Sequence, residues 1–178
     1  MIKTEKRGEY KGRTVELYEL TNENGVKVRI TDYGARVVSL ILPQGGKNPI
    51  DVLLGFDKLA KYVKDDACFG ATIGRYSNRI KGGKFELNGK SYSLTQNEGQ
   101  NHLHGGYNGF DSRLWEGETI NSDEGPGVEL TYVSDDGEEG YPGTLKVSVS
   151  YVLTETNDFT IETKARTDRT NIISLTNH

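Results

Sequence analysis

Residues 145–153 read Leu-Lys-Val-Ser-Val-Ser-Tyr-Val-Leu, and this stretch decides the fold class. Apolar side chains occupy every second position from Leu145 to Leu153, and Lys146, Ser148 and Ser150 alternate with them. Successive side chains of an extended strand point to opposite faces, so one face of this strand packs on a core and the other meets water. The stretch therefore predicts a β-sheet with one buried face.

The same alternation recurs along most of the chain and predicts further strands. Segments 36–42 and 50–56 are instead almost continuously apolar, as in strands that are covered on both faces. Residues 171–177 are also expected to form a strand, which is either an unpaired sheet edge or part of a longer chain. The alternating segments are 15–20, 26–30 and 128–133, together with Phe159 and Ile161.

Short turns separate these segments. Asn88-Gly89 predicts a tight hairpin turn, because both residue types readily adopt positive φ. Similar pairs mark loops at 24–25, 136–137 and 142–143. The one helix expected is short, near 57–64, with Asp57 as its N-cap. The sequence thus predicts an all-β fold, a sandwich of antiparallel sheets.

The overall composition argues against several classes of protein. The chain has 178 residues and a formal net charge of −4. A nucleic-acid binder normally has a basic surface, so we expect no nucleic-acid partner. The single cysteine, Cys68, excludes an internal disulfide. The first residues are polar and no apolar run reaches membrane-spanning length, so we expect a cytoplasmic protein with no membrane partner.

Three histidines, His102, His104 and His178, are candidates for proton transfer, because imidazole gains and loses a proton near neutral pH. Any one of them alone fits a structural role better. His102 and His104 have the spacing of two metal ligands on one strand face. No carboxylate follows before Asp111, and no Cys or Glu cluster supplies further ligands, so we expect no metal site.

Asn78 and Arg79 offer an amide and a guanidinium side by side, and such groups hydrogen-bond sugar hydroxyls. From spacing alone, a structural role for these two residues, as a turn Asn and a surface Arg, fits better than a sugar-binding role. The loop 136–143 concentrates three carboxylates, which we interpret as solvated side chains rather than as a glycosidase pair. Trp115 fits either a sugar-stacking platform or the sandwich core.

Six segments, in this order, resemble the aldose 1-epimerase (galactose mutarotase) family and together cover nearly the whole chain. Each match is weak alone, but the ordered set is specific. Two of them contain His-Leu-His-Gly-Gly at 102–106 and Thr-Asn-His at 176–178. The segments are 31–35, 51–57, 69–80, 102–111, 136–143 and 175–178.

The resemblance implies a large antiparallel β-sandwich with a sugar bound in a cleft on one sheet. It implies that His178 is the general acid for the ring oxygen, and that His104 binds and orients the sugar and stabilises charge. Asn78 and Arg79 would bind its hydroxyl groups, whereas His102 receives no role. The implied reaction interconverts the α and β anomers of free hexoses, galactose and glucose, by opening the ring. Only protons move, so no cofactor is expected.

The resemblance also implies that part of the site lies on residues beyond the Thr-Asn-His motif. The family's general base is a glutamate beyond the Thr-Asn-His motif, and a substrate-binding aspartate precedes it. Residues 1–178 are therefore expected to be the N-terminal part of a single sandwich domain, incomplete in this chain. A second chain carrying the C-terminal half, removal of that half, or truncation of a longer parent would each account for this. The chain alone is expected to have little or no activity.

Two other functions stay open at this point. A non-catalytic carbohydrate-binding module of β-sandwich form could use Asn78, Arg79, His104 and an aromatic platform, but it would not need a proton donor at His178. An epimerase for phosphorylated hexoses would need further cations at the cleft, for which Arg75 and Lys81 lie near Arg79 in the sequence.

Overall fold

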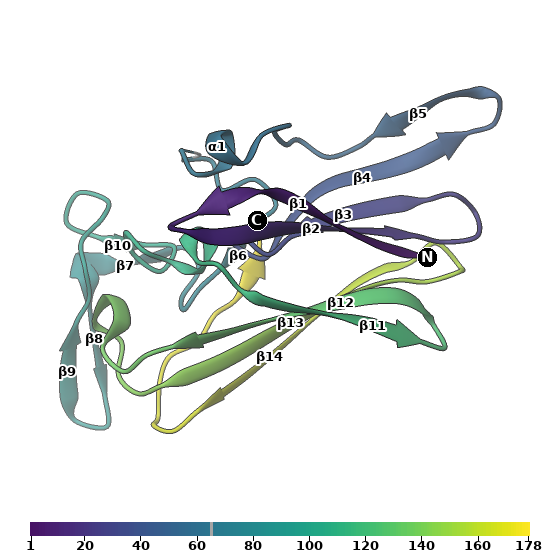
Figure 1. Ribbon diagram of the computed structural model, residues 1–178. Coiled ribbons are helices and arrows are strands. Elements are labelled where there is room, and N and C mark those ends of the chain that lie inside the picture. The colour runs from purple at the N-terminus through teal and green to yellow at the C-terminus, as the bar shows by residue number, and fades with distance from the viewer. Residues whose placement is uncertain (65) are drawn as a thin grey trace.

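The computed structural model describes residues 1–64 and 66–178. Two antiparallel sheets face each other as the layers of a sandwich (Figure 1). The first sheet has the order β1 (Ile2–Tyr10), β2 (Arg13–Thr21), β3 (Lys27–Thr31), β4 (Arg36–Gln44) and β5 (Lys47–Asp51). The second has the order β11 (Glu116–Ser122), β12 (Gly125–Ser134), β13 (Leu145–Leu153) and β14 (Phe159–Thr167). The predicted antiparallel sandwich is confirmed.

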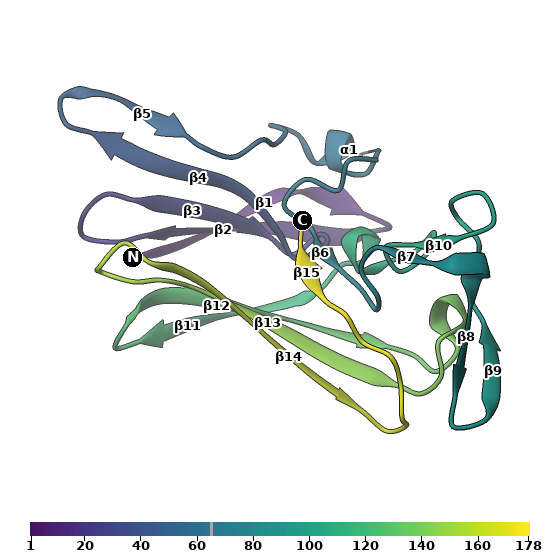
Figure 2. The ribbon, with the colours of Figure 1, turned by 180° about the vertical axis from the view of Figure 1, so that it is seen from behind.

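Three short strand pairs lie toward one end of the sandwich, and helix α1 (Leu59–Tyr62) lies beside the first sheet at the same end (Figure 2). Three 3₁₀ turns accompany them, at Lys81–Gly83, Phe110–Ser112 and Glu138–Gly140. No helix in the described ranges is long and apolar enough to cross a membrane. The pairs are β6 (Thr72–Ile73) with β15 (Thr176–Asn177), β7 (Arg79–Ile80) with β10 (His102–Leu103), and β8 (Lys84–Leu87) with β9 (Lys90–Ser93).

The main core lies between the two sheets. The alternating face of β13 is buried along its whole length, as the sequence predicts, and it packs with apolar residues of β2, β3 and β12. Trp115 is only 1% exposed and belongs to this core, which decides its role against a sugar-stacking platform. A second cluster under α1 contains Val15 and Leu17, so β2 is covered on both faces near its start.

The hairpin predicted at Asn88-Gly89 is confirmed. β8 and β9 flank these two residues, which have φ values of 53° and 73°. Positive φ at both central positions is the signature of a type I′ turn, whose twist matches that of the flanking strands.

The segment 50–56 departs from its predicted form. We expected a strand covered on both faces, but β5 ends at Asp51 and Leu54 is 75% exposed. The reason is that β5 is the edge strand of its sheet, and the chain then leaves the sheet.

The predicted cap of the helix is also wrong. The N-cap of α1 is Lys58, in an extended conformation, and no side chain caps the helix by hydrogen bonding. The helix begins one residue later than Asp57 would require, and it has a single turn.

The segment 171–177 forms a much shorter strand than expected, and that strand has a partner. Only Thr176 and Asn177 form a strand, and they pair with β6. Upstream, the side-chain amide of Asn171 donates to the carbonyl of Pro142 (2.5 Å), which ties this part of the segment to a loop instead of a sheet. Figure 2 shows β15 rising from the end of β14 toward β6.

Candidate functional site

Two short strand pairs bring His104 and His178 together. His178 follows β15, which pairs with β6, and His104 follows β10, which pairs with β7. The centroids of the two imidazole rings are 5.4 Å apart, and the ring planes meet at 84°. The two histidines that the resemblance assigns to chemistry therefore lie edge to face at one end of the sandwich.

The His104 ring is fixed by Asn78. The backbone N–H of Asn78 donates to His104 Nδ1 (2.9 Å), and the backbone N–H of His104 donates to the carbonyl of Asn78 (3.1 Å). Because Nδ1 accepts a hydrogen bond, the proton of the neutral ring sits on Nε2. His104 therefore presents an N–H donor at its far end.

The pKa of His104 lies below its ordinary value. Burial is the largest cause, and the positive charges of His178 and Arg79 add to it. A neutral ring also keeps its hydrogen bond from Asn78, since a proton on Nδ1 would face the N–H of that residue. His104 is thus suited to donate a hydrogen bond to a sugar oxygen while it remains neutral.

His178 is held through its backbone. Its N–H donates to the carbonyl of Ala71 and its carbonyl accepts from Gly70, both at 2.8 Å. The neighbouring Asn177 side chain donates to the carbonyl of Gly70 (2.9 Å). Within the described residues, no hydrogen bond reaches either ring nitrogen of His178, and the residue is exposed. Its imidazole is therefore open to proton transfer.

Asn78 and Arg79 lie beside this pair, but part of each is already engaged. Asn78 is exposed, has a φ of 66°, and its side-chain oxygen accepts from the N–H of Arg79 (2.9 Å). The guanidinium of Arg79 donates twice to Glu98, from Nε (3.1 Å) and Nη2 (2.8 Å). Their assignment to substrate binding stays a prediction. Glu98 was missed because no motif in the sequence links it to Arg79.

His102 is a structural residue. It is fully buried, and its Nδ1 lies 2.7 Å from the carbonyl of Thr95, which can only accept. Nδ1 therefore carries the proton, and Nε2 accepts from the hydroxyl of Tyr141 (2.7 Å). His104 does not continue the strand alternation, because its φ is 53°. In residues 1–64 and 66–178, no group of three His, Cys, Asp or Glu is placed to hold a metal ion.

Arg75 is not available for a ligand. It is 2% exposed, and each of its five donor hydrogens has an acceptor within 3.1 Å. The acceptors are the hydroxyl and carbonyl of Ser134 and the carbonyls of Asp135, Pro142 and Gly143. Arg75 thus clamps the loop at 134–143 and cannot serve as the extra cation that a phosphorylated hexose would need.

The three carboxylates of this loop are not simply solvated, which corrects our interpretation. Asp136 accepts from the backbone N–H of Gly143 (2.6 Å). Glu138 accepts from the hydroxyls of Tyr132 (2.6 Å) and Ser134 (2.7 Å) and from the guanidinium of Arg113 (3.0 Å). Glu139 likewise accepts several hydrogen bonds. A carboxylate between glycines looks solvent-exposed in sequence, because nothing local shows the distant donors that meet it.

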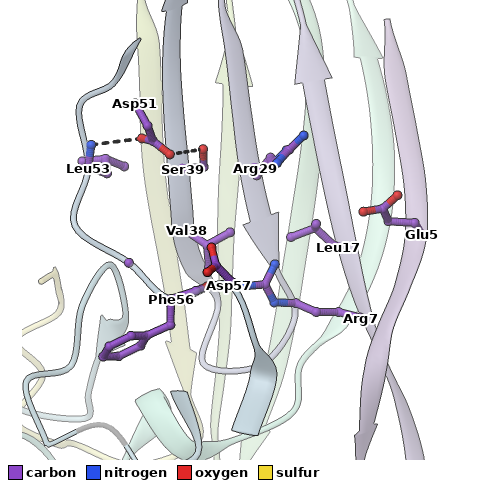
Figure 3. A pocket seen from close by; sticks show the side chains of 11 residues that line it. Glu5, Arg7, Leu17, Arg29, Val38, Ser39, Asp51, Leu53, Phe56 and Asp57 are labelled. Carbon is purple, nitrogen blue, oxygen red and sulfur yellow. Dashed lines mark hydrogen bonds between the residues drawn. The ribbon is translucent and has the colours of Figure 1, made fainter. Parts of the chain in front are cut away.

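A polar hollow of about 280 Å³ lies on the face of the first sheet (Figure 3). Its lining includes Arg7, Arg29 and Asp57, and also Asp51, which accepts from the hydroxyl of Ser39 (2.5 Å). The residues assigned to chemistry by the resemblance do not line it. The hollow is therefore a separate feature from the histidine pair.

Comparison with known proteins decides the family. A model of the family described as aldose 1-epimerase matches residues 16–178. The chain belongs to the aldose 1-epimerase family. A galactose mutarotase from Bos taurus is 41% identical over 165 residues, which is 93% of this chain and 46% of the relative.

Solved structures agree with this aldose 1-epimerase assignment. The crystal structure of a galactose 1-epimerase from Lactobacillus acidophilus has a TM-score of 0.91 and 28% identity, over 100% of this chain and 52% of that one. An aldose epimerase homologue from C. elegans has a TM-score of 0.83 and 34% identity, over 91% of this chain and 49% of that one. The chain spans about half the length of the relatives it matches, and the predicted family is confirmed.

Proposed function

We propose that this chain provides the proton-donating side of an aldose 1-epimerase site, which interconverts the α and β anomers of free galactose and glucose. The observation that carries the proposal is the His104–His178 pair, with ring centroids 5.4 Å apart. The names of the relatives support the same reaction class.

In the proposed mechanism, His178 gives a proton to the ring oxygen of the sugar as the bond from that oxygen to the anomeric carbon breaks. A base removes the proton of the anomeric hydroxyl, which becomes the aldehyde oxygen. The open sugar rotates about its first carbon–carbon bond and closes on the other face with the proton transfers reversed. A positioned acid or base contributes roughly 10²–10⁴-fold to such a reaction.

His104 has a different part in this proposal. Its Nε2–H would donate to a sugar oxygen and so orient the ring next to His178. We assign the base to the glutamate that the resemblance places beyond Thr-Asn-His, on a C-terminal segment in the same or a second chain. A cytoplasmic location is part of the same proposal.

The test is a titration of the chain with D-galactose, followed by the ¹⁵N signals of the histidine rings. We expect the signals of His104 and His178 to shift and the signals of buried His102 to stay in place. Galactitol, which has no ring oxygen, is the control and should shift neither ring. If D-galactose leaves both rings unchanged, the proposed site is wrong.

Polarimetry of freshly dissolved α-D-galactose then separates binding from catalysis. Residues 1–178 by themselves are expected to speed equilibration little, because the assigned base is not among them, and an added C-terminal segment should restore the rate. A fast rate with the pure monomeric chain would contradict that assignment of the base.

A further inference from the structure

One carboxylate that the proposed chemistry does not use joins two loops beside the histidine pair. Glu139 accepts from the backbone N–H groups of Tyr107 (3.2 Å) and Asn108 (2.9 Å). The side-chain amide of Asn108 (3.1 Å) and the hydroxyl of Thr95 also donate to it. Three of these four hydrogen bonds come from the loop that begins at His104. Over the described parts of the chain, no Lys or Arg forms an ion pair with Glu139, so N–H and O–H dipoles balance its charge.

The loop that Glu139 holds has an unfavourable backbone. His104, Gly105 and Gly106 follow one another with φ values of 53°, 90° and 100°. A left-handed conformation costs a non-glycine residue roughly 1–2 kcal/mol, so contacts from elsewhere must impose it on His104. A Cβ atom at Gly106 would overlap the carboxylate of Glu139, which shows how closely the two segments fit.

Glu139 is itself held in place. Its φ is 51°, and its carbonyl accepts from the N–H of Thr95 (3.1 Å). Burial alone would raise the pKa of Glu139, but hydrogen bonds from Thr95, Asn108 and Tyr107 outweigh burial and lower it. The carboxylate is therefore ionised at neutral pH and accepts hydrogen bonds at full strength.

We propose that Glu139 is a positioning residue that fixes the His104 loop and thereby aims the His104 ring at His178 and the sugar. The part of this inference that concerns the sugar rests on the proposed function. The part that concerns the ring does not, since the hydrogen bonds and the ring geometry belong to the chain itself.

The neighbouring carboxylate offers a matched control. Glu138 lies in the same turn and also accepts several hydrogen bonds, but its donors are Tyr132, Ser134 and Arg113. None of these three residues belongs to the His104 loop. Replacing either Glu by Gln removes one negative charge from the same turn, but only Glu139 accepts hydrogen bonds from the His104 loop.

The experiment compares Glu139→Gln with Glu138→Gln in the full chain, using the ¹⁵N signals and the pH titration of the His104 ring. A Gln at 139 has one oxygen acceptor where the carboxylate has two. We expect Glu139→Gln to shift or broaden the His104 signals, to move its titration, and to weaken galactose binding about tenfold, the loss expected for one misaligned hydrogen bond. Glu138→Gln should lower stability but leave the His104 signals at their wild-type positions.

Thr95→Val is the milder variant if Glu139→Gln does not fold, because it removes only one donor to the carboxylate. It should change the His104 signals in the same direction, by less. His104 signals that stay at wild-type positions in a folded Glu139→Gln, or in Thr95→Val, would overturn the proposal. So would equal changes in the two Gln variants. If the wild-type chain binds no galactose, the proposed function fails, and the ring signals still decide the role of Glu139.

Discussion

The two histidines of the site are held in opposite ways. His104 is part of a network, with Asn78 on its ring nitrogen and Glu139 on the loop that follows it. His178 is anchored by backbone hydrogen bonds to Gly70 and Ala71, next to the pairing of β15 with β6, and its ring is exposed. The difference matches the proposed roles, because an orienting group needs a fixed direction, whereas a proton donor must exchange its proton with substrate and solvent.

The comparison also shows where stability and chemistry are coupled. The contacts of Asn78 and Glu139 hold both the loop at His104 and the His104 ring, so a change in this loop disturbs both the fold and the ring. The His178 ring, by contrast, can be removed while the backbone hydrogen bonds of residue 178 stay in place. Three experiments test this contrast, from the largest expected effect to the smallest.

Gly105→Ala should disrupt the loop that follows His104 and lower the stability of the fold. A Cβ at this position would overlap the carbonyl oxygen of Gly74, and the φ of 90° is strained for any other residue. We expect a loss of roughly 3 kcal/mol or more in the free energy of unfolding, measured by urea denaturation, because overpacking and backbone strain add.

Gly89→Ala is the matched control for this experiment. Its φ is 73°, but nothing lies within 4 Å of the added Cβ, so only strain of about 1 kcal/mol is expected. Equal losses in the two variants would show that the close approach to Gly74 contributes nothing.

The second experiment measures the coupling between the two rings. Removing the positive charges that oppose its protonation, with His178→Ala or Arg79→Gln, should raise the pKa of His104. Burial remains the main cause, so the pKa should stay below the ordinary value of about 6.5 in both variants. An NMR titration of the His104 ring checks this, and an unchanged pKa in both variants would contradict it.

The sign of this shift also fixes how His104 affects stability. Since its pKa is lower in the fold, the unfolded chain binds the proton more tightly as the pH falls below about 6.5, and the fold is weakened. Asp32 acts in the opposite direction, because burial raises its pKa to about 7. The ring signal of His104 therefore reports the shift more directly than a stability curve does.

The smallest effect is expected for the stability of His178→Ala. The ring makes no hydrogen bond among the described residues, and the backbone bonds to Gly70 and Ala71 do not depend on it. The free energy of unfolding should change by less than about 0.5 kcal/mol. A loss comparable to that of Gly105→Ala would show that His178 is built into the fold as firmly as His104.

The fold class could be predicted from sequence because its signals are local. The alternation along β13 and the Asn-Gly turn between β8 and β9 each depend on neighbouring residues only. The segment 50–56 misled us because hydrophobicity alone cannot show that a chain leaves its sheet at an edge.

The candidate site is proposed from the sequence only through the resemblance to a family. The mutual hydrogen bonds of Asn78 and His104 join two residues that both have positive φ, and the sequence does not fix that conformation at either one. The clamp around Arg75 and the donors around Glu139 come from segments far away in sequence. Such contacts are properties of the folded chain, and no short motif records them.

The burial of Trp115 has a practical consequence. It is the single tryptophan of the chain, and its indole N–H donates to the carbonyl of Phe110 (3.1 Å) inside the core between the sheets. Its fluorescence should be that of an indole shielded from water, with a red shift when the sheets separate. The protein thus contains its own optical probe of unfolding, placed where it reports the integrity of the sandwich.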